Sequence, residues 1–231
     1  MITRLAMTKL WRSGEAEPRP KRPNIAIRLV RRFRNEFFPP PHPFDEATGA
    51  ETAGIIHLLR LHIKSANRKH GRAYAGIDPS TFANSMAEVR EDFSKFTFVD
   101  LGSGKGRALI LAAQLGFSEL IGVEFSEHLA KIAQENLARL NMRNVSILVQ
   151  DAVEYTFPEK PLVVFMFNPF GPDILRMVLQ NLQRHKGPLY LVYCNPLEEE
   201  EIRNAGFLLP IKTGKPHAVW TRPKVDVGRE V

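Results

Sequence analysis

Cysteine is almost absent from this sequence of 231 residues, in which Cys194 is the only one. An internal disulfide and a cysteine-based zinc cluster are therefore excluded. A single thiol fits the reducing environment of the cytoplasm, where we expect the protein to be located. The seven histidines have no metal-ligand spacing, so no metal site is predicted.

Long apolar runs are also missing. No segment has the roughly 20 consecutive apolar residues that a membrane-spanning helix needs, and we predict no transmembrane segment. The N-terminus lacks the apolar stretch of a secretory signal. It is rich in arginine instead, which is also typical of an organelle-targeting peptide, although a disordered basic tail is the simpler interpretation.

Acidic residues are scarce near the N-terminus, where residues 1–34 contain ten Lys and Arg but only Glu15 and Glu17. The net charge of +7 favours an acidic partner, and this tail is where a nucleic acid would bind, because the rest of the chain is close to neutral. We predict a basic, proline-rich and partly disordered extension over residues 1–50. Within it, apolar residues at helical spacing over residues 25–38 predict an amphipathic helix. Such a helix rests on the domain surface, a membrane or a nucleic acid, and we prefer packing on the domain surface.

The character of the sequence changes at residue 51, where we place the start of a domain that extends to residue 231. Apolar residues at helical spacing predict a helix from residue 55 to about residue 71 and a second one over residues 79–92. Together they would form a helical lid segment over residues 51–94.

Strands and helices then alternate along the chain. Strands are predicted over residues 96–100, 120–124, 145–149, 162–167, 189–193, 207–211 and 217–221, and helices over residues 106–115, 127–140, 172–185 and 197–205. This alternation predicts a doubly wound α/β fold with a mostly parallel seven-stranded sheet and helices on both faces. The loop before the last strand is too short for a crossover helix, so the sheet should finish in a C-terminal antiparallel hairpin.

A glycine-rich loop, Asp-Leu-Gly-Ser-Gly-Lys-Gly over residues 100–106, follows the first strand of this alternation. Glycines permit positive φ angles and close approach of a ligand to the backbone. A dinucleotide-binding fingerprint requires a small residue at its third conserved position, and here that position is Arg107, which is too large for close helix packing. The loop also lacks the Lys-Ser/Thr ending of a phosphate-binding P-loop. Lys105 and Arg107 are interpreted as solvated charges.

Two acidic residues follow the next two strands. Glu124 ends the second strand, where its carboxylate can accept hydrogen bonds from both ribose hydroxyls of a nucleoside, and Asp151 follows the third strand. Glu124 alone would also fit NAD.

The loop and these two residues resemble class I S-adenosylmethionine-dependent methyltransferases, and the resemblance covers about residues 72–222. It implies that S-adenosylmethionine is the cofactor, with Asp151 accepting from the adenine amino group. Tyr74 is a lid residue or a packing residue in this comparison. The implied cofactor-binding residues are Asp100, Gly102, Ser103, Gly104, Gly106, Glu124, Phe125, Asp151, Ala152 and Tyr74.

The fourth strand is followed by Asn168-Pro169-Phe170-Gly171, similar to the Asn-Pro-Pro-Tyr motif of methyltransferases that modify nitrogen. The Asn168 carbonyl oxygen and a backbone carbonyl near Pro169 can accept the two protons of an amino group, while Phe170 walls the pocket. An ordinary turn is the alternative. Asn195-Pro196, after the fifth strand, is interpreted as a structural turn.

The two motifs together look most like bacterial relatives of the non-SET lysine methyltransferases. That resemblance implies N-methylation of a protein lysine side chain. N-methylation of a nucleic-acid base amino group is the alternative that the basic tail favours. A non-catalytic protein that binds the donor or NAD is a third hypothesis.

Overall fold

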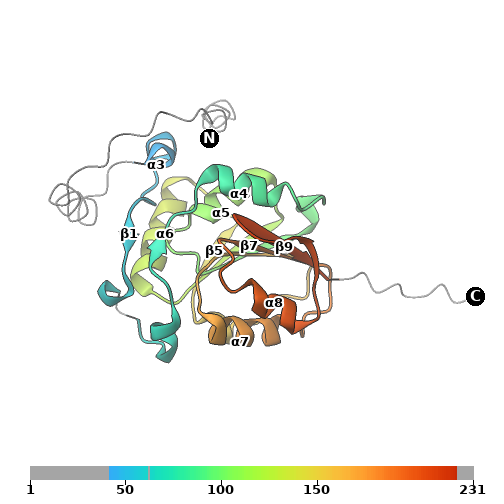
Figure 1. Cartoon of the computed structure of the whole chain (residues 1–231). Helices are drawn as coiled ribbons and strands as arrows, with labels where there is room; N and C mark the ends of the chain where they lie inside the picture. The colour runs from blue at the N-terminus through green and yellow to red at the C-terminus, as the bar shows by residue number, and fades with distance from the viewer. Residues whose placement is uncertain (1–41, 62, 223–231) are drawn as a thin grey trace, which may run out of the picture.

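The computed structural model describes residues 42–61 and 63–222 of the chain (Figure 1). A seven-stranded sheet lies between two groups of helices, so the domain has three layers. The strand order is β5-β4-β3-β6-β7-β9-β8. The predicted α/β fold with a mostly parallel seven-stranded sheet is therefore confirmed.

The sheet is parallel up to β7 and antiparallel beyond it. Its strands are β3 (Thr97–Leu101), β4 (Glu119–Glu124), β5 (Val145–Val149), β6 (Leu162–Phe167), β7 (Leu189–Cys194), β8 (Leu209–Lys212) and β9 (His217–Thr221). Strand β9 pairs antiparallel with both β7 and β8, as predicted for the C-terminal hairpin. Strand order reverses on either side of β3, which has β4 on one side and β6 on the other. Ligands bind at such a reversal, outside the carboxyl ends of the strands.

Helices cover both faces of the sheet. On one face lie α4 (Pro79–Met86), α5 (Arg107–Ala112) and α6 (Glu127–Arg139), and on the other lie α7 (Pro172–Leu182) and α8 (Glu199–Ala205) (Figure 1). Consecutive residues of β3 belong to different apolar clusters, with Phe98 on the α4–α5 side and Val99 on the α7 side. This alternation follows from the two-residue period of a strand, and it builds a core on each face.

The single helix predicted over residues 55–71 is wrong. This part of the chain contains β1 (Ile55–Ile56), the short 3-10 helices η1 (Leu58–Arg60) and η2 (Ala66–His70), and β2 (Tyr74–Ala75), which pairs antiparallel with β1. Spacing of four residues should have placed Ile55, Leu59 and Ile63 on one helix face. However, Ile55 is 55% and Leu59 90% exposed, whereas Ile63 is buried. We call residues 57–75 the strap.

Other helix bounds differ by less. Helix α4 begins at Pro79 as predicted, with the Asp78 carboxylate accepting from the Thr81 N–H at 2.9 Å, but it ends at Met86 instead of near residue 92. At and beyond the helix end the chain forms tighter turns, in which the Glu88 and Val89 N–H groups donate to the carbonyls three residues earlier. Helix α7 also ends earlier than predicted, at Leu182, and α8 begins later, at Glu199.

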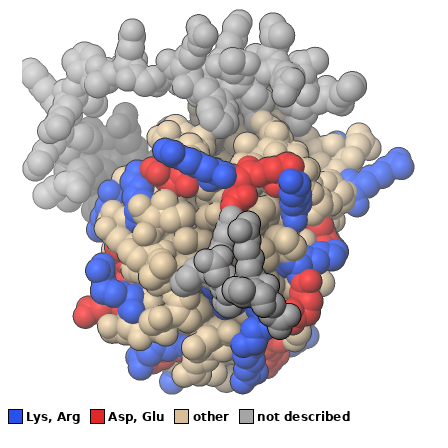
Figure 2. Space-filling view, turned by 90° about the vertical axis from the view of Figure 1, so that its right-hand side faces the viewer, with Lys and Arg blue, Asp and Glu red and all other residues tan. Residues whose placement is uncertain are grey.

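Most of the predicted basic extension, including the amphipathic helix over residues 25–38, lies outside the described residues. Within residues 42–50 a short helix, α3 (Pro43–Thr48), places Phe44 in the core. Residues 42–222 contain 20 Lys and Arg and 20 Asp and Glu. Both signs are interspersed on the face shown in Figure 2. No helix of the described part of the chain has the length and hydrophobicity needed to span a bilayer.

Candidate active site

A cleft lies at the carboxyl ends of β3, β4 and β6, under the strap. Counted together with the solvent space at its mouth, its empty volume is about 730 Å³. Gly104, Glu124, Asp151 and Asn168, which come from four separate loops, all line it. The other predicted site residues that line it are Gly102, Phe125, Ala152, Tyr74, Pro169 and Phe170. Segments as far apart in sequence as residues 58 and 174 thus border one cavity.

The glycine loop turns sharply between β3 and α5. Gly102, Gly104 and Gly106 have φ angles of 77°, 54° and 85°, a region that other residues rarely adopt. A Cβ atom on Gly102 would lie 2.6 Å from the Pro169 Cβ, and one on Gly104 would lie 2.3 Å from the Tyr74 ring. We call Asn168-Pro169-Phe170-Gly171 the acceptor motif. Glycine is therefore needed at both positions, because the acceptor motif and the strap pack directly on the loop.

Glu124 is the last residue of β4, and its carboxylate holds the glycine loop through a hydrogen bond. Its Oε2 accepts from the Gly104 N–H at 2.8 Å, and its Oε1 accepts from the Ser126 N–H at 2.9 Å. Burial raises the pKa of Glu124 to about 7. Asp100 is buried behind the loop, where desolvation and the nearby charge of Glu124 raise its pKa to about 8.

Three predicted cofactor residues do not line the cleft, namely Asp100, Ser103 and Gly106. The buried Ser103 hydroxyl oxygen has no hydrogen-bond partner among the described residues and faces β4, 2.8 Å from the place of a Cβ on Gly122. Gly106 is the N-cap of α5 and faces Ala133 of α6. All three belong to the loop, and they can shape its backbone without bordering the cavity.

Asp151 follows β5, at the opposite end of the cleft from β6, the strand that precedes the acceptor motif. Its Oδ1 accepts from the Val153 N–H at 3.1 Å. Its Oδ2 accepts from the strap, at 2.5 Å from the Ser65 hydroxyl and 3.0 Å from the Asn67 amide. These two strap residues were not identified from the sequence, because they are 86 and 84 residues away from Asp151.

Lys105 and Arg107 are buried, so their interpretation as solvated charges is wrong. The Lys105 Nζ donates to the Ala53 carbonyl at 2.9 Å. The Arg107 guanidinium donates to the Thr52 hydroxyl at 2.7 Å and to the Ile77 carbonyl at 3.1 Å. Both side chains thus hold the segments on either side of the strap against the glycine loop. Tyr74, whose hydroxyl donates to the Thr52 carbonyl at 2.6 Å, completes this arrangement.

The acceptor motif begins at Asn168, where the chain leaves β6 with a left-handed φ of 45°. Asparagine tolerates this conformation better than most residues. The Asn168 Oδ1 accepts from the Tyr193 hydroxyl at 2.9 Å, and the Pro169 carbonyl accepts from the Arg72 N–H at 3.1 Å. A carbonyl oxygen has two lone pairs, so each can accept a second hydrogen bond. Asn195 does not line the cleft.

The residues of the cleft fit S-adenosylmethionine. A carboxylate offers about four acceptor positions, and the contacts above leave at least one on Glu124 for ribose and one on Asp151 for the adenine amino group. Leu58, Leu61 and Leu129 provide apolar walls between them. The bare Cα atoms of the glycine loop permit the close approach that a ligand without phosphate requires.

The raised pKa of Glu124 predicts that S-adenosylhomocysteine binds more tightly as the pH rises. In this assignment the carboxylate accepts a hydrogen bond from a ribose hydroxyl, and well below the pKa its population falls about tenfold per pH unit. The Kd measured by calorimetry should therefore weaken by up to about fivefold from pH 7 to pH 6 and level off above pH 8. Glu124→Gln should bind weakly with little pH dependence. Tighter binding at the lower pH would contradict the assignment.

Comparison with known proteins agrees with this geometry. Residues 98–188 match the family described as a methyltransferase domain. The chain is 30% identical over 87 residues to a ribosomal protein L11 methyltransferase of Fusobacterium nucleatum, which covers 36% of this chain and 28% of that protein. It is 26% identical over 117 residues to a protein-L-isoaspartate O-methyltransferase of Methanoculleus marisnigri, covering 51% of this chain and 52% of that protein. The chain thus spans about a quarter to a half of these curated relatives.

Among solved structures, a putative RNA methyltransferase from Pyrococcus horikoshii shares the fold. Its TM-score is 0.51 at 20% identity, over 74% of this chain and 94% of that one. The sheet order and the glycine loop agree with this match, so residues 98–188 have the features of a class I, Rossmann-like methyltransferase domain. Its methyl donor is S-adenosylmethionine.

Proposed function

We propose that this chain transfers the methyl group of S-adenosylmethionine to the nitrogen of a protein side chain, with the ε-amino group of lysine as acceptor. The observation that carries the proposal is the position of Asn168 and Pro169. Their two carbonyl oxygens lie at the carboxyl end of β6, beside the glycine loop that Pro169 contacts. An amino group held by both oxygens would direct its lone pair into the part of the cleft next to the loop.

The chemistry needs positioning more than proton transfer. The sulfonium of the donor supplies an activated methyl group. The amine nitrogen forms a bond to the methyl carbon while the carbon–sulfur bond breaks and its electron pair stays on sulfur. Near-attack alignment of nitrogen and carbon accounts for the acceleration. A lysine must first lose a proton, because its ordinary pKa is about 10.4, and a desolvated cleft favours its neutral form.

The L11 methyltransferase relative supports a protein acceptor, since its name assigns it a ribosomal protein as substrate. The strap supports the second candidate, a nucleic-acid amino group. Residues 52–77 contain five Lys and Arg and no Asp or Glu, and the strap lies over the cleft. A polyanionic acceptor would be attracted to such a surface, and its binding would weaken steeply with salt.

Tritiated donor and a bacterial lysate test the two acceptors together. After the reaction the sample is divided, one half is treated with protease and the other with nuclease, and the acid-insoluble label is counted. We expect protease to release the label and nuclease to leave it in place, and amino-acid analysis should then give methyllysine. Label released by nuclease would favour the nucleic-acid acceptor, and absence of label in both halves would contradict methyl transfer to either class.

A further inference from the structure

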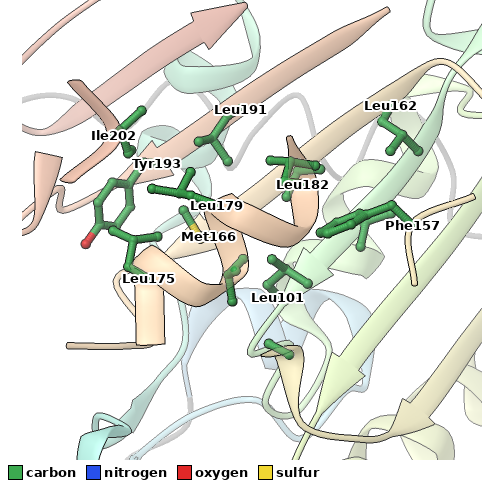
Figure 3. Close-up of a cluster of buried hydrophobic side chains, with 14 of the residues drawn as sticks. Leu101, Phe157, Leu162, Met166, Leu175, Leu179, Leu182, Leu191, Tyr193 and Ile202 are labelled. Carbon is green, nitrogen blue, oxygen red and sulfur yellow. The ribbon is translucent and has the colours of Figure 1, made fainter. Parts of the chain in front are cut away.

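A buried hydroxyl group reaches the acceptor motif from the neighbouring strand. Tyr193 lies on β7, which pairs with β6, and its side chain is 1% exposed. Its ring packs in the apolar cluster that contains Leu175 and Ile202, while its hydroxyl lies at the edge of that cluster (Figure 3). From there the hydroxyl donates a 2.9 Å hydrogen bond to the Asn168 Oδ1.

The Tyr193 hydroxyl also accepts a hydrogen bond from the backbone. The Glu198 backbone N–H donates to the Tyr193 oxygen at 3.4 Å. A backbone N–H can act only as a donor, so the phenol oxygen accepts on that side and keeps its own proton available for Asn168. In this structure the Asn168 amide has its oxygen, and not its nitrogen, toward Tyr193.

The same turn is tied to the strap. The Glu198 carboxylate pairs with the Arg72 guanidinium at 2.5 Å, and Arg72 also donates from Nε to the Phe170 carbonyl at 3.2 Å. The Arg72 backbone N–H donates to the Pro169 carbonyl. Tyr193 is thus part of a connected set of contacts that encloses the acceptor motif, and it is the member that bonds to the Asn168 side chain.

We propose that Tyr193 is a positioning residue for methyl transfer, which holds one lone pair of the Asn168 amide oxygen so that the other faces the acceptor nitrogen. This inference rests on the proposed transfer to an amino group at Asn168. Tyr193 itself touches neither the donor nor the acceptor in this arrangement. Burial raises the pKa of Tyr193 to about 12, so its hydroxyl keeps its proton throughout the usual assay range.

Tyr193→Phe tests the proposal, because it removes the hydroxyl and keeps the buried ring. Tyr190→Phe is the matched control on the same strand, where the lost hydroxyl donates to the exposed Glu91 at 2.7 Å. With tritiated donor and lysate protein as acceptor, we expect Tyr193→Phe to lower kcat by about 10- to 100-fold. The KM of the donor and the Kd of S-adenosylhomocysteine should stay within about twofold, and the control should keep its kcat. An unchanged kcat, or an equal loss of donor binding, would overturn the proposal.

A measurement without turnover separates this inference from the proposed function. In ¹⁵N-labelled protein, the side-chain amide resonances of Asn168 can be assigned by their loss in Asn168→Ala. They should move in Tyr193→Phe and stay in place in Tyr190→Phe, and unmoved resonances would refute the positioning role. If the wild type labels nucleic acid instead of protein, the proposed acceptor is wrong, while the kcat comparison still tests Tyr193 on that acceptor. If it labels neither, the proposed transfer fails and the resonances alone report on the contact.

Discussion

Replacing Asn168 with alanine is expected to lower the rate of methyl transfer by at least about 100-fold while leaving the Kd of S-adenosylhomocysteine within about threefold of the wild type. The side-chain oxygen is lost, so the amino group keeps only the Pro169 carbonyl and is no longer aligned with the methyl group. Asn168 is next to the glycine loop but does not belong to it, which is why donor binding should survive. Label transfer and calorimetry measure the two quantities.

Asn195 offers a matched control for this substitution. It has a left-handed φ of 50°, it precedes a proline, and it follows β7 just as Asn168 follows β6. It does not line the cleft. Asn195→Ala therefore introduces alanine into the same strained backbone conformation without touching the acceptor site. If the Asn168 and Asn195 variants keep similar activity, Asn168 has no role in holding the acceptor.

Loss of the Asn168 side chain also leaves the Tyr193 hydroxyl without its acceptor inside the protein. An unsatisfied buried donor costs about 1–3 kcal/mol of stability. We therefore expect a lower Tm for Asn168→Ala than for the wild type, and activity should be measured well below that temperature. Retained binding of S-adenosylhomocysteine provides the check that the variant is folded.

Replacing Gly104 with aspartate is expected to weaken the binding of S-adenosylhomocysteine by at least about 100-fold, or about 2.7 kcal/mol. The new Cβ would lie 2.3 Å from the Tyr74 ring, so the loop or the strap must move. The carboxylate would add a negative charge close to Glu124, which accepts from the Gly104 N–H. Thermal shift measures the effect: S-adenosylhomocysteine should raise the Tm of the wild type, NAD should not, and the variant should respond to neither.

The control variant Gly116→Asp separates the effect of excluding the ligand from the effect of backbone strain. Its φ of 83° also disfavours side chains, but a Cβ there would meet nothing within 4 Å. Gly116→Asp should therefore lose some stability and still respond to S-adenosylhomocysteine. If Gly104→Asp binds S-adenosylhomocysteine as tightly as Gly116→Asp does, the glycine loop is not the donor site. A Tm increase with NAD would instead favour the dinucleotide hypothesis.

The four loop ends around the cleft could be anticipated because each one is marked locally. Gly104, Glu124, Asp151 and Asn168 all follow short apolar strands, and parallel strands bring their carboxyl ends to one edge of a sheet. The roles assigned to these residues in binding and transfer stay predictions. Asp100, Ser103 and Gly106 carried the same motif signal but do not line the cleft, since a motif does not specify which of its residues face the ligand.

The strap could not be anticipated in this way. Its apolar residues have helical spacing, but its conformation depends on partners far along the chain, such as Asp151 for Ser65 and Glu198 for Arg72. Tyr193 looked like one more residue of a buried strand. Nothing near it in the sequence shows that its hydroxyl lies beside Asn168, 25 residues away.

By itself, the sequence determined the mostly parallel sheet with its C-terminal hairpin, the glycine loop and the acidic residues at the strand ends. The period of apolar residues and the conformational freedom of glycine act over only a few residues, so they can be recognised in the sequence. Only the tertiary structure decided that Lys105 and Arg107 are buried, that the strap lies over the cleft and that the Tyr193 hydroxyl bonds to Asn168. Burying a charge or a hydroxyl is affordable only when distant groups supply its hydrogen bonds, and which groups those are depends on the folded arrangement.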